Sequence, residues 1–205
     1  MPTVHCGWPS CPEQAWLHLT EADGVRLRAE HHLCDAHARQ FFATVRASSH
    51  CGCGPSGRSR GAVCFGVDLV VIDERSSEQL VCLREVGGRR EFAYATGIFE
   101  ACAINWILTR SPYPRPLTHC AVVEVIRALG GALRSLDVNA MCDNIYEAKL
   151  HIEQAAREVD VDVRIGDGVP VAVAAGAPIF IGDDVLAKAP EAPPDGILWK
   201  PSWGS

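Results

Sequence analysis

The sequence lacks three features that would place it in other classes of protein. No apolar run comes near the roughly 18 residues that a membrane span needs. The first residues, Met1 to Cys6, contain neither a basic nor an apolar segment, so we expect no secretory signal. A positive charge excess is also missing, since 19 Lys and Arg stand against 25 Asp and Glu and the net charge is −6. These absences favour a cytoplasmic globular protein without a membrane partner.

Three changes of composition divide the 205 residues, which are enough for a small domain and a medium one. Residues 1–46 are rich in Cys and His, and residues 47–61 form a Gly/Ser-rich linker. A pattern of strands and helices occupies residues 62–188, and a Pro-rich tail covers residues 189–205. We therefore expect an N-terminal module, a linker, a main domain and a tail.

The ten cysteines fall into two groups. Five lie in the first quarter beside most of the histidines, whereas the other five are spread singly through apolar stretches. In a reducing compartment the first group indicates metal binding and the second indicates small buried side chains. A disulfide framework is the weaker interpretation without a signal peptide.

Four residues of the first group have the spacing of a zinc site. Cys6-x4-Cys11 is followed after 22 residues by Cys34-x2-His37. Zn²⁺ takes four tetrahedral nitrogen or sulfur ligands, and a hairpin over residues 16–33 that turns at Asp23-Gly24 would join the two pairs. A helix is expected from Asp35 to Arg46. The pattern resembles the zinc-ribbon-like modules of some bacterial adaptor and repair-associated proteins.

Four filled ligand positions predict a closed, structural zinc site that stabilises the N-terminus or recognises a protein partner. Free cysteines in a small domain are the alternative. Five further residues are possible substitute ligands, and the short segment at 50–53 is a candidate for a separate metal: His5, His32, His50, Cys51 and Cys53.

The main region alternates strand and helix patterns. Strands are predicted at Val67–Ile72, Leu80–Leu83 and Arg90–Ala95. A helix is predicted over Gly97–Thr109 with Ile98, Ala101, Cys102 and Trp106 on its apolar face. Three prolines make residues 111–116 a loop. A second helix is expected to start at an N-cap Thr118, to place Val122, Ile126 and Leu129 on one face, and to stop at Gly130-Gly131.

A β-hairpin is the clearest local prediction. Apolar and polar residues alternate over Tyr146–Glu153 and again over Glu158–Arg164. The register that pairs Glu153 with Glu158 gives three opposite-charge pairs, each contributing up to about 1 kcal/mol: His151 with Asp160, Lys149 with Asp162, and Glu147 with Arg164. This register makes the stripe Glu158, Asp160 and Asp162 a solvated, ion-paired face in preference to a metal site.

Four segments carry a family resemblance over about 125 residues. Gly97–Ile104 resembles the G-x-x-E-A-x-A-I stretch of bifunctional nuclease (BFN) domains, and Arg115–His119 is identical to their R-P-L-T-H signature. Val159–Asp167 resembles the strand that leads into R-P-S-D-A-I-A-L-A. Ala177–Phe180 with Val185-Leu186 matches the closing P-I-F-V…V-L.

The resemblance implies an α+β domain with a mixed β-sheet and packed helices, commonly oligomeric, that hydrolyses DNA and RNA. Two departures put activity in doubt. Cys120 replaces the Asp that usually follows the R-P-L-T-H histidine, and Gly166–Val171 puts two glycines and a proline into the expected helix start. The helix is then expected to begin one turn later.

Phosphodiester hydrolysis needs stabilisation of phosphoryl charge and proton transfer at oxygen. Among the motif residues, Arg115 and Arg164 are candidate phosphate clamps and His119 is a candidate general acid or base. Glu100 and Asp167 are candidate Mg²⁺ or Mn²⁺ ligands. Each also has a structural explanation as an ion-pair partner or as an acid at a helix start. A nuclease requires them in one cleft, whereas a non-catalytic binding or regulatory module predicts them scattered or locked in pairs.

Overall fold

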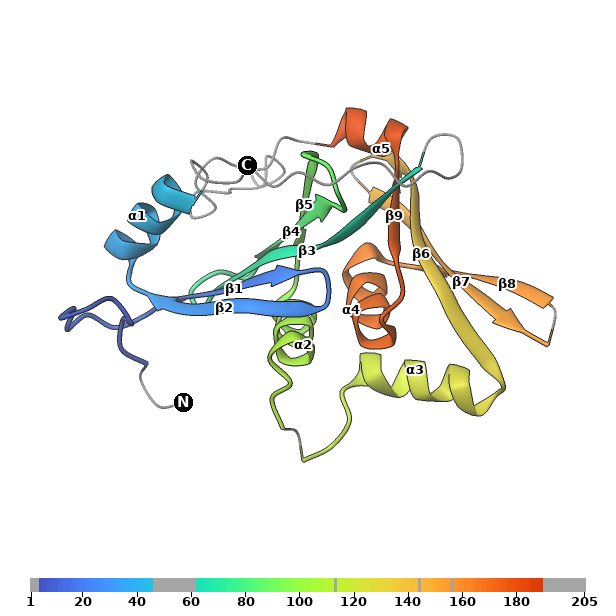
Figure 1. Ribbon diagram of the computed structural model, residues 1–205, viewed down its shortest axis with the longest axis horizontal. Helices are drawn as coiled ribbons and strands as arrows, with labels where there is room; N and C mark the ends of the chain where they lie inside the picture. The colour runs from blue at the N-terminus through green and yellow to red at the C-terminus, as the bar shows by residue number, and fades with distance from the viewer. Residues whose placement is uncertain (1–3, 46–61, 113, 144, 156, 190–205) are drawn as a thin grey trace.

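The computed structural model describes residues 4–45, 62–112, 114–143, 145–155 and 157–189 (Figure 1). Within these residues it has nine strands and five helices, in the order β1 (Leu17–Asp23), β2 (Arg26–Leu33), α1 (Asp35–Val45), β3 (Ala62–Asp73), β4 (Gln79–Glu85), β5 (Glu91–Thr96), α2 (Ile98–Thr109), α3 (Thr118–Ala128), β6 (Gly131–Cys142), β7 (Ile145–Gln154), β8 (Arg157–Val163), α4 (Ile165–Ala175), β9 (Ile179–Gly182) and α5 (Asp183–Lys188). The α+β class is confirmed.

One mixed sheet organises the described residues. Its strand order is β2-β1-β3-β9-β6-β7-β8, and β4 pairs with β3 and β5. The pairs are antiparallel except β6 with β9, which is parallel over Leu136–Val138 and Ile179–Ile181. The central strands β6 and β9 were not predicted. The alternation of β6 is interrupted by register shifts between Leu133 and Ser135 and between Val138 and Ala140, and β9 has only four residues. No helix of the described residues is both long and apolar enough to cross a membrane.

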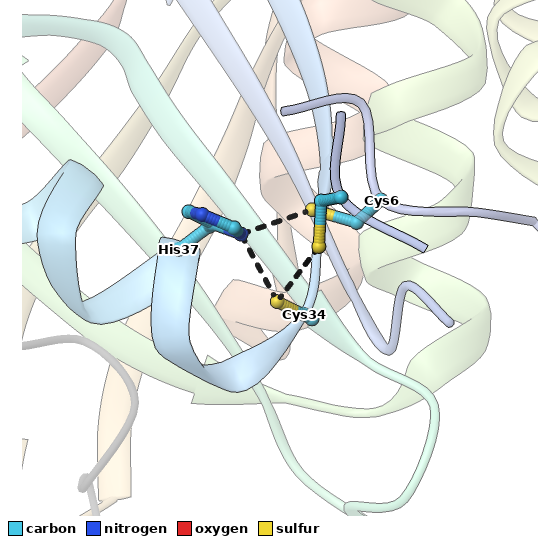
Figure 2. Close-up of side chains that lie close together, drawn as sticks. Cys6, Cys34 and His37 are labelled. Carbon is cyan, nitrogen blue, oxygen red and sulfur yellow. Dashed lines mark hydrogen bonds between the residues drawn. The ribbon is translucent and has the colours of Figure 1, made fainter. Parts of the chain in front are cut away.

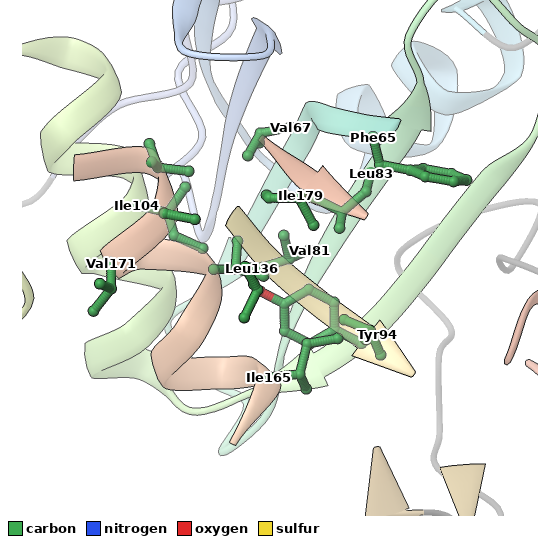
Figure 3. Packing of buried hydrophobic residues seen from close by; sticks show 14 of the residues in the cluster. Phe65, Val67, Val81, Leu83, Tyr94, Ile104, Leu136, Ile165, Val171 and Ile179 are labelled. Carbon is green, nitrogen blue, oxygen red and sulfur yellow. The ribbon is translucent and has the colours of Figure 1, made fainter. Parts of the chain in front are cut away.

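Strand alternation divides the buried side chains into two clusters. In β4, Val81 and Leu83 face one cluster with α2 and α4, while Leu80 and Cys82 face the other with α1. This explains why β4 is a continuous apolar run, since both of its faces are covered. Figure 3 shows the larger cluster, where Tyr94, Leu136 and Ile165 lie close together.

The β-hairpin has the predicted register. Glu153 pairs with Glu158, Lys149 with Asp162, and His151 with Asp160, whose carboxylate contacts the imidazole at 2.6 Å. The predicted pair of Glu147 with Arg164 is wrong, because β8 ends at Val163 and the Arg164 side chain turns to Asp167. Both faces of the edge strand β8 are largely exposed among the described residues, and Val159 and Val161 are 40% and 39% exposed.

Helices α2 and α3 have the predicted extents but partly different faces. In α2 the buried side chains are Ala101, Ala103, Ile104 and Leu108, whereas Trp106 is 37% exposed. The predicted face of α3 is wrong, since Val123 is buried while Val122 and Leu129 are exposed. Thr118 is the first helical residue rather than the N-cap; Leu117 holds that position without a side-chain cap. Gly130 ends α3 with φ 77°, as expected.

Helix α4 starts at once after β8, not one turn later as expected. Its glycines allow this, because a side chain at Gly168 would come within 2.7 Å of Leu136 and one at Gly166 within 2.6 Å of the Thr96 hydroxyl. Pro170 is the sixth residue of the helix and is buried. Gly166 and Gly168, which led us to expect a later helix start, therefore let the first turn of α4 lie close against the sheet.

The N-terminal hairpin continues the main sheet. Strand β1 pairs with β3 from Leu17↔Asp73 to Glu21↔Leu69, and Leu17, Leu19 and Phe42 share a cluster with Val71 and Leu80. The division into a module at 1–46 and a domain at 62–188 stays a prediction. The predictions for the linker, the tail from residue 190 onward, and His50, Cys51 and Cys53 lie outside the described residues.

Candidate functional site

The four predicted zinc ligands lie together at the start of α1. The ligand atoms of Cys6, Cys11, Cys34 and His37 are all within 4.8 Å of one another. His37 Nδ1 is 3.5 Å from Cys6 Sγ and 3.2 Å from Cys34 Sγ (Figure 2), and the Cys11 and Cys34 sulfurs are 3.9 Å apart. A tetrahedral Zn²⁺ site with Zn–S of about 2.3 Å requires S–S edges of about 3.8 Å and S–N edges slightly shorter. The group therefore fits a metal ion such as zinc.

Local structure fixes this arrangement. Cys34 precedes the first residue of α1 and accepts the Ala38 N–H through its carbonyl, so the positive end of the helix faces the thiols. The Trp8 ring stacks on the His37 imidazole at 4.8 Å. The β1–β2 pairing carries Leu33 to the end of the hairpin and so delivers Cys34 beside the Cys6 loop.

The electrostatic interactions among the cysteine thiols of this group also favour the binding of a cation. Burial raises the pKa of Cys6, but hydrogen bonds from the Cys34 and Trp8 backbone outweigh it, so the pKa is lowered overall. The backbone of Glu13 lowers the pKa of Cys11, but burial and the neighbouring Cys6 and Cys34 raise it overall. Several thiolates this close repel one another without a bound cation, which is the condition that a metal ion relieves. Cys6 and Cys34 are buried, so the site is closed and suited to a structural role.

A second group lies where α2, α3 and α4 begin. His119, the second residue of α3, places Nε2 3.8 Å from Asp167 Oδ1. The other oxygen of Asp167 accepts the Nε–H of Arg164 at 2.7 Å. Asp167 is the third residue of α4 and Arg164 is its N-cap, so one carboxylate joins the starts of two helices. We call His119, Arg164, Asp167 and Glu100 the helix-start group.

Glu100 belongs to this group through α2. A side chain at Gly166 would meet Thr96 and Glu100, so the start of α4 lies against the start of α2. The charge of Glu100 helps to raise the pKa of Arg164, after the larger effect of the Asp167 hydrogen bond. It also adds to the raised pKa of Tyr94, whose main cause is burial. The carboxylates of Glu100 and Asp167 therefore act on the same small region.

Arg164 is the more exposed of the two ion-paired side chains in the group, since Asp167 is 35% exposed. The Arg164 side chain is 81% exposed, whereas His119 is 14% exposed. Arg115 is exposed in the loop that leads into α3, four residues before His119. Leu117 and Arg164 make no side-chain cap hydrogen bond, and Gly97 has no side chain to make one, so helix N-termini without side-chain caps meet here. In α4 the N–H of Asp167 donates to the carbonyl of Arg164. Cys120, at the position of the family Asp, is half-buried.

The sequence prediction missed part of a third group, on the opposite face of the sheet. Asp137 of β6 lies 3.1 Å from His151 Nε2, and Asp160 contacts His151 Nδ1. The hairpin alternation identified the His151–Asp160 pair. Asp137 was not found because β6 was not predicted.

Comparison with known proteins places the helix-start group inside a matched region. Residues 81–193 match the bifunctional nuclease domain. Two uncharacterized proteins of Mycobacterium tuberculosis, from strains CDC 1551 and H37Rv, are each 31% identical over 124 residues, which is 60% of this chain and 74% of the relative. The Cys/His group precedes the matched region.

Proposed function

Because this chain belongs to the bifunctional nuclease domain family, we propose that it hydrolyses phosphodiester bonds of DNA or RNA at the helix-start group. The observation that carries this proposal is the convergence of three helix starts with His119, Arg164, Asp167 and Glu100. Helix N-termini and an exposed guanidinium bind the phosphate oxygens of a nucleic acid backbone. Because a net charge of −6 disfavours binding over the whole surface, we place the strand at the helix starts with the guanidinium groups of Arg164 and Arg115.

Each residue has a separate role. Arg164 keeps its terminal nitrogens exposed while Asp167 holds its Nε, so the guanidinium can clamp a phosphate without losing its position. Asp167 also orients His119, which transfers a proton to or from the reacting oxygen. Arg115 lies on the loop beside the start of α3 and provides a second phosphate contact.

A divalent ion completes the proposal. Glu100 and Asp167 are the carboxylates that would hold Mg²⁺ or Mn²⁺, which bind through one or two protein oxygens and keep several waters. The ion supplies charge stabilisation at the phosphoryl oxygens. The Cys/His group keeps a separate, structural zinc ion, and its surface remains available to a protein partner.

The alternative function is a non-catalytic module that binds nucleic acid or protein. The Arg164–Asp167 ion pair favours it, because a side chain engaged within its own helix start is less available for chemistry. Cys120, in place of the family carboxylate, points the same way. In this case the helix starts bind phosphate without cleaving it.

A homo-oligomer is part of the same proposal. Val122, Val125 and Leu129 are exposed on α3, and Val159 and Val161 on β8. These surfaces adjoin, since a side chain at Gly131 would meet both Ile126 of α3 and Ile152 of β7, and Ile152 pairs with Val159. A second copy of the chain would bury this apolar area. Light scattering on Val125→Asp should then report a smaller mass than on wild type.

The test is cleavage of labelled single-stranded DNA and RNA by zinc-loaded protein, with Mg²⁺, Mn²⁺ or EDTA added. His119→Ala and Arg115→Ala are assayed in parallel. Cleavage that follows the divalent ion and is lost in both folded variants supports the proposal. Equal traces of cleavage in wild type and variants indicate a contaminant, and the binding-module function then replaces the nuclease.

A further inference from the structure

A shallow cavity of about 190 Å³ lies on the face of β6, β7 and β8 that points away from α3 and α4. Strand alternation fixes this side, because Leu136, Val138 and Leu150 face the core while Asp137 and His151 face the cavity. Glu153 and Glu158 also line the cavity. It is thus separated by the sheet from the helix-start group.

His151 is held there between two carboxylates on neighbouring strands. Its Nδ1 is 2.6 Å from Asp160 Oδ1, a distance that places a proton between them. Its Nε2 is 3.1 Å from Asp137 Oδ2, but the contact does not have hydrogen-bond geometry. In the part of the chain that the structure describes, both Nε2 and Asp137 Oδ1 are buried without a hydrogen-bond partner. Orphaned buried atoms of this kind mark a place that suits a bound water or ion.

The two facing atoms are placed for a shared cation. His151 Nε2 and Asp137 Oδ2 lie 3.1 Å apart without hydrogen-bond geometry, while Asp160 holds the other ring nitrogen. A separation of about 3 Å suits two atoms bound at right angles to one metal ion with bonds of about 2.1 Å. A carboxylate that holds the far nitrogen of a metal-bound His is the usual supporting contact.

The charged side chains around the cavity also favour a bound cation. Asp137, Glu153 and Glu158 line it together with one guanidinium, that of Arg134, which pairs with Glu153 at 2.6 Å. Glu158 lies directly opposite Glu153 in the register, and two like charges in such a pair destabilise a sheet. A cation in the cavity offsets this repulsion.

We propose that Asp137 and His151 Nε2 bind a divalent transition-metal ion in this cavity, with water as the remaining ligands and Asp160 holding the imidazole. Mixed nitrogen and carboxylate donors suit Mn²⁺, Fe²⁺ or Zn²⁺. The site is distinct from the Cys/His group and does not depend on nuclease activity.

Mn²⁺ is the probe, because it competes poorly with zinc for thiolates. Zinc-loaded full-length protein is titrated with Mn²⁺, and free ion is followed by its electron paramagnetic resonance signal. The same titration on Asp167→Asn removes any contribution from the helix-start group. We expect saturable binding in both proteins. Affinity should fall more than tenfold in Asp137→Asn and His151→Gln, and about tenfold in Asp160→Asn.

Glu147→Gln, an exposed change on the same face of β7, is the matched control and should bind as wild type does. Thermal midpoints establish that each variant is folded. Glu158→Gln removes one exposed carboxylate of the cavity and should weaken binding less than Asp137→Asn does. Absence of saturable binding overturns the proposal and identifies His151 as a doubly protonated ion-pair partner. Undiminished binding in Asp137→Asn and His151→Gln overturns it as well, as does binding lost only in Asp167→Asn.

Discussion

The Cys/His group and the helix-start group differ in how firmly their residues specify a function. In the first, four ligand atoms lie within 4.8 Å of one another around a volume that suits a metal ion. In the second, His119, Arg164 and Asp167 make contacts that also occur in ordinary ion pairs. Closely spaced Cys and His side chains seldom gather for a purpose other than metal binding, whereas carboxylates and guanidinium groups form ion pairs on most protein surfaces.

The two regions are also built differently. The Cys/His group comes from a loop, a hairpin end and one helix start, and a bound metal ion would hold these segments together. The helix-start group is positioned by packing, since Gly166 and Gly168 let α4 approach Thr96 and Leu136. The stability of the fold should therefore depend on the Cys/His group, and the cleavage activity should depend on the helix-start group.

The largest expected effect is loss of the metal ion. Cys34→Ser should abolish zinc binding and lower the free energy of unfolding by several kcal/mol, less than the roughly 10 kcal/mol gained by isolated zinc fingers, because β1 also pairs with β3. The thermal midpoint should fall by about 10 °C or more. Zinc content and calorimetry measure this. Cys142→Ser, at an exposed cysteine, is the control, and an equal midpoint in both variants would refute a structural role for the metal.

The next effect concerns chemistry. Asp167→Asn removes the charge that orients both His119 and Arg164, so the cleavage rate should fall about 100-fold while the thermal midpoint changes little. Asp184→Asn alters an exposed Asp in the first turn of α5 and should leave the rate unchanged. Equal rates in the two variants would remove Asp167 from the mechanism.

A smaller effect links packing to the helix-start group. Gly168→Ala would put a methyl group 2.7 Å from Leu136, and such overpacking costs about 1 to 3 kcal/mol. Denaturant unfolding measures the loss, and adding Leu136→Val should restore part of it. Full stability in the single variant would mean that α4 is not held this close to the sheet.

The smallest effect concerns binding. Arg164→Gln should reduce the slope of log affinity against log salt for single-stranded RNA by about 0.7, the value for one phosphate contact. Fluorescence anisotropy at several salt concentrations measures it. Arg90→Gln, which removes a guanidinium paired with Glu85 and Asp183, should keep the wild-type slope. A slope unchanged in both would place the strand elsewhere.

How much could be predicted from the sequence differs between the two regions. Spacing and alternation predict the Cys/His group, the hairpin register from His151↔Asp160 to Glu153↔Glu158, and the extents of α2 and α3. The exposed face of α3 could not be found, because Val122 and Leu129 differ from buried residues only in what covers them. The closeness of Glu100 to Gly166 depends on how α2 and α4 pack, which no local pattern contains.

Phosphate binding at the three helix starts tests most directly whether the helix-start group binds a nucleic acid backbone. Zinc-loaded, isotope-labelled protein is titrated with a phosphorothioate dinucleotide that resists cleavage, and backbone amide shifts are mapped by nuclear magnetic resonance. If the helix starts bind the phosphate, the largest shifts occur at residues 98–100, 118–120 and 165–167, together with the side chain of Arg164. Absent shifts, or shifts confined to β1, β2 and α1, would contradict phosphate binding at the helix starts.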